Sequence, residues 1–246
     1  MKKLITLLFI FILLCSCGKK TEEADAAITH EGNEASVAET YAELNKSWDE
    51  NYAINNDYIG ELTVGELLTC PFVQGRTNDA YLRRGWQTMN YDEEGSVFLD
   101  SRNSLDDQNL IIYGHYVYAS YDASGTHKFT PLRLLTEEEN YEANRYITLQ
   151  LQDEIRTYEI ALVLYVDTYV AEDGLRYTVP ELQYDHTDFG DYFDIFITNA
   201  EAAAFYDTGI RPVKNDRLLT LQTCVEGNED LREIVVARLI NTVNTR

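Results

Sequence analysis

Short runs of aliphatic, β-branched and aromatic residues dominate this sequence, and they constrain its fold more than any other feature. Several runs alternate loosely between apolar and polar residues, as half-buried strands do. The last two runs, 218–223 and 233–240, are almost continuously apolar, which is typical of strands buried on both faces. Pro71 favours an edge strand or a bend for the run that contains it. The expected strands are residues 58–64, 67–74, 96–99, 110–118, 147–151, 158–169, 218–223 and 233–240, with a hairpin turn at 152–154.

Helical patterns interrupt these runs. Ser36 and Glu39 have the spacing of a capping box, and apolar residues then recur at three- and four-residue steps until about Asn55. This pattern predicts an amphipathic helix that packs on the sheet. Shorter helices are expected from Thr136 to about 144 and within 188–206. The sequence therefore predicts a mostly β fold, a mixed β-barrel with added helices. The apolar stripe of the first helix comprises Val37, Tyr41, Leu44, Trp48 and Tyr52.

The N-terminus is typical of a targeting segment. Two lysines precede an apolar run at 4–14, which is too short for a bilayer that needs ~20 apolar residues but suits a secretory signal peptide. The segment 14–18 resembles a bacterial lipobox, which predicts a lipoprotein signal peptide at 1–16 and lipidation of Cys17. An ordinary signal peptide and a retained membrane anchor are the alternatives. Residues 17–35 are expected to form a flexible tether, and 36–246 a single domain.

The charge of the chain limits its partners. The net charge is −22, and the predicted signal peptide carries two lysines and no acidic residues. This acidity argues against nucleic acid, whose binders carry basic patches. It also disfavours close contact with anionic lipid. An acidic surface keeps an exported domain soluble, and it also attracts amine-bearing partners by electrostatic steering.

Cysteine and histidine are sparse. With residues 1–16 removed and Cys17 lipidated, only Cys70 and Cys224 remain as thiols. So few cysteines suggest no disulfide framework. Cys70 is interpreted as a buried apolar residue, with a redox partnership with Cys224 as the alternative. His30, His127 and His186 lie in polar segments and are expected to be solvated, whereas His115 directly follows a β-type run.

Six blocks of sequence, in order, resemble the sortases, and the segments between them resemble the class B branch. The similarity covers most of residues 55–239. A helix inserted before the cysteine-bearing strand, which we expect within 188–206, is a further class B trait. The resemblance implies a sortase-like mixed β-barrel with an N-terminal helix. The blocks are 56–60, 70–82 (without 76–77), 95–103, 109–115 (Asn-Leu-Ile-Ile-Tyr-Gly-His), 220–224 (Thr-Leu-Gln-Thr-Cys) and 232–239 (Arg-Glu-Ile-Val-Val-Ala-Arg-Leu).

The resemblance implies a catalytic trio. Cys224 corresponds to the nucleophile, His115 to the acid and base, and Arg232 to the group that stabilises the oxyanion or holds the substrate. These residue types suit amide exchange, because a thiolate forms a thioester that an amine resolves and a histidine can carry the proton both ways. Arg is permanently charged and has several donors. Without the resemblance, Cys224 is interpreted as a small core residue, His115 as a turn residue and Arg232 as a solvated side chain.

Four further residues are candidates for substrate binding: Tyr113, Gln222, Thr223 and Arg83. Gln222 stands where the family usually has Ser, and Arg83 occupies a place that helps to form the substrate groove in the family. Glu61 replaces a usual Trp, and Cys70 stands where an aromatic residue commonly precedes the Pro. None of these departures removes a catalytic group, and Gln222 and Arg83 leave the substrate preference open.

The resemblance also implies a function. A class B-like sortase cleaves the sorting signal of a surface protein after Thr and joins it to an amine in peptidoglycan or a pilin-like subunit. It acts outside the cytoplasmic membrane, here held by its lipid anchor, and it needs no cofactor. The alternatives are a sortase-fold binding lipoprotein with little turnover and a thioester hydrolase. Acidic residues at 185–194 offer a weaker calcium hypothesis, against their simpler interpretation as the acid-rich start of a helix. No metal site is predicted.

Overall fold

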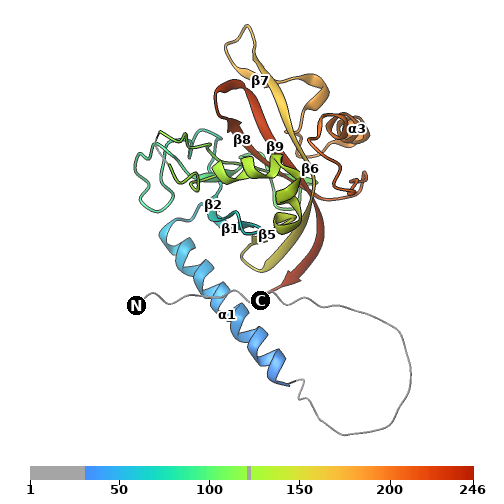
Figure 1. The fold of residues 1–246 in the computed structure, drawn as a ribbon. Coiled ribbons are helices and arrows are strands. Elements are labelled where there is room, and N and C mark those ends of the chain that lie inside the picture. Colours follow the sequence, from blue (N-terminus) through green and yellow to red (C-terminus); the bar gives the residue numbers. More distant parts are fainter. Residues whose placement is uncertain (1–30, 121–122) are drawn as a thin grey trace, which may run out of the picture.

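The computed structural model describes residues 31–120 and 123–246, and the side chains from residue 37 onward. The predicted signal peptide, the lipidation site Cys17, His30 and the first part of the predicted tether lie outside the described residues. Within the described part, strands predominate and a few helices surround them (Figure 1). No helix in this part combines the length and the apolar character that crossing a membrane requires.

Eight strands of the described chain close into a barrel, in the order β5-β1-β2-β3-β4-β8-β9-β6, because β6 also pairs with β5. The β2–β3 and β4–β8 pairs are parallel, and the other pairs in the barrel are antiparallel. The predicted mixed β-barrel with added helices is confirmed. The barrel strands are β1 (Tyr58–Val64), β2 (Leu68–Val73), β3 (Val97–Leu99), β4 (Asn109–Tyr113), β5 (Tyr146–Gln150), β6 (Glu154–Val170), β8 (Leu218–Val225) and β9 (Asn228–Asn244).

The long strands β6 and β9 extend beyond the barrel, and β7 (Arg176–Thr178) pairs with the far end of β6. In Figure 1 this hairpin rises above the barrel, and helix α3 (Phe193–Ala203) lies beside it. The helix packs against the outer face of the sheet through Phe193, Phe196 and Ile197, which are buried with Leu218 and Val236. The predicted helix before the cysteine-bearing strand is therefore present.

The barrel is filled by a separate apolar core. Its centre contains Leu62, Phe72, Ile112, Leu221 and Val235, all with no exposed surface. Side chains alternate between the two faces of a strand. Consequently, odd-numbered residues of β8 point into the barrel and even-numbered ones point outward. This alternation decides which side chains of β8 can reach a ligand at the outer surface.

The N-terminal helix is longer than the sequence predicts. Helix α1 spans Glu31–Ile54, so Ser36 lies inside it and the capping-box prediction is wrong. Acidic residues favour a helix N-terminus electrostatically, and Glu31 and Glu34 supply them earlier in the chain. The helix docks through Trp48 of the apolar stripe, which is buried and donates Nε1–H to the carbonyl of Ile59 at 2.9 Å, whereas Tyr52 of the same stripe is exposed.

Two further predictions need correction. Strand β2 is an interior strand, although Pro71 favoured an edge. The proline is tolerated because pairing with β3 begins only at Phe72, so β2 is locally an edge at Pro71. The expected strand 110–118 ends at Tyr113, where a turn through Gly114 follows. The remaining short helices are η1 (Thr130–Thr136), η2 (Glu138–Asn140), α2 (Tyr141–Asn144), η3 (Pro180–Leu182) and η4 (Gly190–Tyr192).

Candidate active site

Cys224 lies near the end of β8, on the outer face of the barrel. Its side chain shares that face with Gln222, whereas Thr223 between them points inward. The residue is half-buried and its thiol is free. A free thiol that is neither fully exposed nor fully buried has the access that a nucleophile needs.

Arg232 lies directly opposite Cys224 on β9, as its register partner in the antiparallel pair. Opposite residues of such a pair project to the same face, with Cβ atoms ~4.5–5.5 Å apart. In this structure Nη1 of Arg232 donates to the carbonyls of Leu231 at 2.7 Å and Glu229 at 3.0 Å. The guanidinium has further N–H groups beyond these two contacts.

His115 follows β4 after a single glycine. Gly114 donates its N–H to the carbonyl of Gln222 at 3.1 Å, which ties this turn to the cysteine-bearing strand. A side chain at Gly114 would meet the ring of Phe129 at 2.5 Å, so the close approach requires glycine. Nε2 of His115 lies 2.8 Å from the carbonyl oxygen of Leu82. Burial lowers the pKa of His115 below its ordinary value, although the contact with Leu82 acts in the opposite direction.

Cys224 and His115 line one cleft of about 250 Å³. A neighbouring cavity of about 280 Å³ contains Arg232, and the two share Tyr113 and Gln222 as a common wall. No hydrogen bond joins Cys224 to His115 in the described part of the chain. Catalytic contacts are often long in the absence of substrate, so this geometry is compatible with a dyad that tightens on binding.

Three of the four residues predicted to bind substrate line different cavities of the protein. Gln222 accepts a hydrogen bond at Oε1 from the hydroxyl of Tyr184 at 2.6 Å. Tyr113 donates its hydroxyl to Asp100 at 2.8 Å. Arg83 lies with His115 in a third cavity, of about 390 Å³, away from Cys224. Its guanidinium donates to the carbonyl of Glu93.

Thr223 requires a correction. Its side chain has no exposed surface and points into the barrel, because its place in the strand is one residue out of phase with Gln222 and Cys224. The side chain therefore does not face the cleft, and we leave it out of the substrate-binding set. The alternation of side chains along a strand, with a period of two residues, predicts that Thr223 faces away from Gln222 and Cys224.

Comparison with known proteins explains this arrangement. No protein-family model matches the sequence. Sortase B of Listeria monocytogenes is 28% identical over 203 residues, which cover 81% of this chain and 72% of that protein. The crystal structure of Clostridium perfringens sortase B is 30% identical, with a TM-score of 0.64, and the match covers 78% of this chain and 99% of that one. The chain belongs to the sortase family.

A second solved structure supports the fold alone. The complex of Staphylococcus aureus sortase B with a substrate is 21% identical, with a TM-score of 0.65, covering 86% of this chain and 96% of that one. Sortases are cysteine transpeptidases, and the trio predicted from the sequence occupies adjoining strands and turns of this sortase's barrel.

Two groups at the site escaped the sequence analysis. Tyr184, which orients Gln222, lies in an irregular segment whose sequence carries no regular pattern. Asp100 is fully buried beside Arg102, which donates to it from Nε at 2.9 Å and from Nη2 at 2.8 Å. Burial alone would raise the pKa of Asp100, but the hydrogen bonds from Arg102 and Tyr113 outweigh it and keep that pKa below its usual range. This pair could have been recognised in the sequence, because the block 95–103 contains both Asp100 and Arg102.

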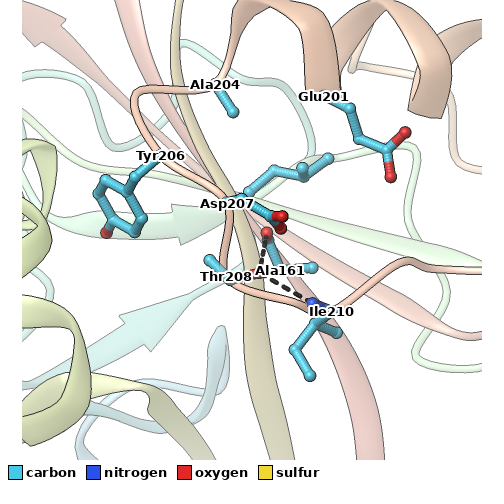
Figure 2. A pocket seen from close by; sticks show the side chains of 8 residues that line it. Ala161, Glu201, Ala204, Tyr206, Asp207, Thr208 and Ile210 are labelled. Carbon is cyan, nitrogen blue, oxygen red and sulfur yellow. Dashed lines mark hydrogen bonds between the residues drawn. The ribbon is translucent and has the colours of Figure 1, made fainter.

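A further cavity of about 460 Å³ lies on another part of this sortase, between β6 and the segment after α3 (Figure 2). The polar groups labelled there have partners within the protein: Thr208 donates its hydroxyl to the carbonyl of Ala161 at 2.7 Å, and Ile210 N–H donates to the Thr208 hydroxyl at 3.2 Å. Glu201 forms an ion pair with Arg211. Neither Cys224, His115 nor Arg232 lines this cavity.

Cys70, Asp188 and Asp191 line neither the cleft of Cys224 nor the cavity of Arg232, although Asp185 of the acidic segment lines the latter. Cys70 is a free thiol that packs against the barrel core, and burial raises its pKa to about 12. Asp191 pairs with Lys214, and Asp188 accepts from the N–H of Gly190. Within residues 31–120 and 123–246, no three His, Cys, Asp or Glu side chains are grouped so as to hold a metal ion.

Proposed function

We propose that this protein is a class B-like sortase that cleaves the sorting signal of a surface protein after Thr and transfers the new acyl end to an amine. The observation that carries the proposal is the geometry of three residues. Cys224 and His115 line one cleft, and Arg232 lies opposite Cys224 on the neighbouring strand. The site supplies a nucleophile, a proton carrier and a fixed cation within adjoining elements.

In the first half-reaction, the Cys224 sulfur attacks the carbonyl carbon of the Thr residue in the sorting signal. The C–S bond forms, a tetrahedral intermediate collapses, and the peptide C–N bond breaks. His115 takes the proton of the Cys224 thiol as the sulfur attacks and then donates it to the departing amine. The products are a thioester on Cys224 and the released C-terminal fragment.

In the second half-reaction, an amine attacks the thioester carbonyl and passes its surplus proton to His115. The new C–N bond forms as the C–S bond breaks, and His115 returns the proton to the Cys224 sulfur, which leaves as a thiol. In each half-reaction the same imidazole therefore serves as base and then as acid, which requires a residue that changes protonation state near neutral pH.

Both half-reactions place negative charge on the carbonyl oxygen. Arg232 offers permanent charge and several N–H donors on the face that Cys224 occupies. A backbone N–H near Cys224 completes the oxyanion hole. The contacts of Arg232 with the carbonyls of Glu229 and Leu231 engage Nη1 and leave other donors for the substrate.

The partners follow from the same proposal. Gln222 and Tyr113, at the wall between the two cavities, bind the sorting peptide. Arg83 contributes from the third cavity, which it lines together with His115. The acceptor is an amine of peptidoglycan or of a pilin-like subunit. We place the catalytic domain outside the cytoplasmic membrane, anchored by lipid on Cys17 through the segment 17–35, of which 31–35 belong to helix α1.

The test is incubation of the purified protein with a library of sorting-signal peptides and amine acceptors, followed by mass spectrometry. A thioester on Cys224 and an amine-joined product, both lost in Cys224→Ala and the joined product lost in His115→Ala, are the expected results. Cleavage without amine transfer would identify a thioester hydrolase. The absence of any adduct, with Cys224 still open to alkylation, would favour a binding protein.

A further inference from the structure

We infer that the main-chain carbonyl of Leu82 orients the imidazole of His115, so that Nδ1 is the nitrogen that exchanges protons in the reaction. The inference deepens the proposed function and rests on it for the catalytic role of His115. Its structural part, the identity of the protonated nitrogen, stands independently. A nucleophile–base pair commonly has its base oriented by a third group, and here that group is a backbone carbonyl.

The contact itself fixes the roles of the ring nitrogens. Nε2 of His115 lies 2.8 Å from the Leu82 oxygen, and a carbonyl oxygen only accepts hydrogen bonds. The hydrogen is therefore on Nε2, and a neutral ring has its lone pair on Nδ1. No described residue bonds Nδ1. Because Cys224, Leu82 and His115 line the same cleft, an unprotonated Nδ1 is the nitrogen left for the chemistry.

The tautomer matters because the imidazole of His115 is neutral in the free enzyme. Burial lowers the pKa of His115, and the neighbouring cations Arg83 and Lys128 act in the same direction, opposed by Asp92 and by the Leu82 contact. The imidazole is therefore neutral at neutral pH in the free enzyme. A neutral ring has one donor and one acceptor nitrogen, and a ring with the wrong tautomer cannot accept the proton where the thiol offers it.

The Leu82 carbonyl is held from its N-terminal side by Tyr81. The Tyr81 ring is 1% exposed, and its hydroxyl donates to Asp57 at 2.8 Å while it accepts from Nδ2 of Asn55 at 2.8 Å. The Tyr81 carbonyl also accepts from the N–H of Ser96 at 3.0 Å. Asn55 and Asp57 join α1 to β1. The position of the carbonyl is thereby tied to the barrel rather than to a free loop.

Gly95 lies against the same carbonyl. A Cβ at this position would stand 2.4 Å from the Leu82 oxygen and 2.6 Å from the Tyr81 oxygen. Gly95 also has a φ of +57°, in the left-handed region that favours glycine. An added methyl group must therefore displace the Leu82 carbonyl, which provides a way to disturb the orienting group without changing His115.

The direct test is long-range ¹H–¹⁵N correlation spectroscopy on the full-length ¹⁵N-labelled protein in detergent micelles near pH 7.5. The His115 signals are assigned by their loss in His115→Gln. The expected spectrum shows Nε2 protonated and Nδ1 with the shift of an unprotonated nitrogen. A spectrum with the hydrogen on Nδ1 would overturn the inference. This measurement needs no turnover, so it stands even if no peptide substrate is found.

The second test moves the carbonyl. Gly95→Ala is compared with Gly190→Ala, whose φ of +53° is similar but whose added Cβ would meet nothing within 4 Å. Both changes place a side chain on a residue with left-handed backbone and therefore carry a similar backbone strain. We expect Gly95→Ala alone to give a mixture of tautomers, a shifted pH profile and a kcat lower by roughly tenfold to hundredfold. An unchanged tautomer and pH profile in Gly95→Ala would contradict the inference.

Tyr81→Phe provides a milder disturbance if Gly95→Ala does not fold. It keeps the buried ring and removes the hydroxyl contacts with Asp57 and Asn55. A small shift of the His115 ¹⁵N signals and of the pH profile, with KM unchanged, is expected. Signals identical to wild type would show that Tyr81 does not position the carbonyl. If the wild-type protein turns over no peptide, the proposed function is in question while the tautomer result remains.

Discussion

The hydroxyl of Tyr184 donates to Oε1 of Gln222 across 2.6 Å, at the wall shared by the cavity of Cys224 and that of Arg232. Tyr184 is buried, and burial raises the pKa of its phenol, so the hydroxyl is protonated and a donor at neutral pH. Because Oε1 is occupied, the Gln222 side chain offers its Nε2–H groups to the cleft. The pair thus presents donors, and a peptide carbonyl is the group that suits them.

Gln222→Glu keeps the size of the side chain and the acceptor for Tyr184 but removes both N–H donors. We expect kcat/KM for the peptide substrate to fall by about tenfold or more, since a hydrogen bond contributes ~0.5–1.5 kcal/mol and a misplaced charge adds to the loss. Tyr184→Phe should have a smaller effect in the same direction. Both variants should react with a small alkylating agent at the wild-type rate, and a changed rate would show that Cys224 itself was disturbed.

Arg232→Lys keeps the charge but replaces a planar, multidentate donor with a point charge. Loss of one oxyanion donor costs about 10²–10³ in kcat, and we expect a decrease in this range because lysine cannot reproduce the fork. Single-turnover acylation of Cys224 is the measurement. Arg238→Lys is the matched control, since Arg238 lies on the same strand and pairs with Glu159 at 3.6 Å, away from the cleft. Equal losses in both variants would assign Arg232 a structural role.

Much of the barrel was predictable because local patterns coincide with the tertiary environment. Alternation and β-branched composition gave β1 with its observed bounds, and they gave the β5–β6 hairpin and the core of β8. These strands bury one or both faces, so their sequences carry the pattern directly. The start of α1 was missed because acidic residues upstream of Ser36 extend the helix, and propensity of this kind is a weak local signal.

The three proposed catalytic residues were recognisable in the sequence as residue types that end or open β-type runs, but their surroundings were not. The role that we infer for the Leu82 carbonyl depends on a backbone atom, and any residue in that position supplies one. Tyr184 reaches Gln222 from 38 residues away in the chain, through an irregular segment with no periodicity. The sequence already indicates that the Thr223 side chain does not face the cleft, because adjacent residues of a strand point to opposite faces and Thr223 is adjacent to Cys224.

Trp48→Ala should detach the N-terminal helix. The indole is 5% exposed, stacks on Tyr52 and donates to the Ile59 carbonyl at 2.9 Å, and truncation of a buried Trp costs ~3–5 kcal/mol. We expect a lower urea midpoint and faster hydrogen exchange in α1. Tyr52→Ala is the control, because Tyr52 is 38% exposed and should cost much less. Similar losses in the two variants would contradict the role of Trp48 as the anchor.

Glu233 gives the fold a dependence on pH. It lies inside the barrel beside Arg232, faces Thr223 on β8 and Tyr165 on β6, and has 1% exposure. Its Oε1 atom and the Thr223 hydroxyl have no hydrogen-bond partner among the described residues. Burial raises the pKa of Glu233 from 4.5 to about 8, while the charge of Arg133 on η1 acts in the opposite direction. A buried carboxyl group that is unpaired is more stable when neutral.

The sign of the effect follows from proton binding. Between pH 4.5 and about 8 the unfolded chain releases a proton that the folded chain retains, so the free energy of unfolding falls as the pH rises through this window. Glu233→Gln cannot ionise, so it should match wild type near pH 4 and exceed it by a few kcal/mol at pH 9. Urea unfolding at pH 4, 6.5 and 9 measures this difference. Glu229→Gln, on an exposed part of the same strand, should leave the pH dependence unchanged, and identical behaviour of the two variants would show that Glu233 is ionised throughout.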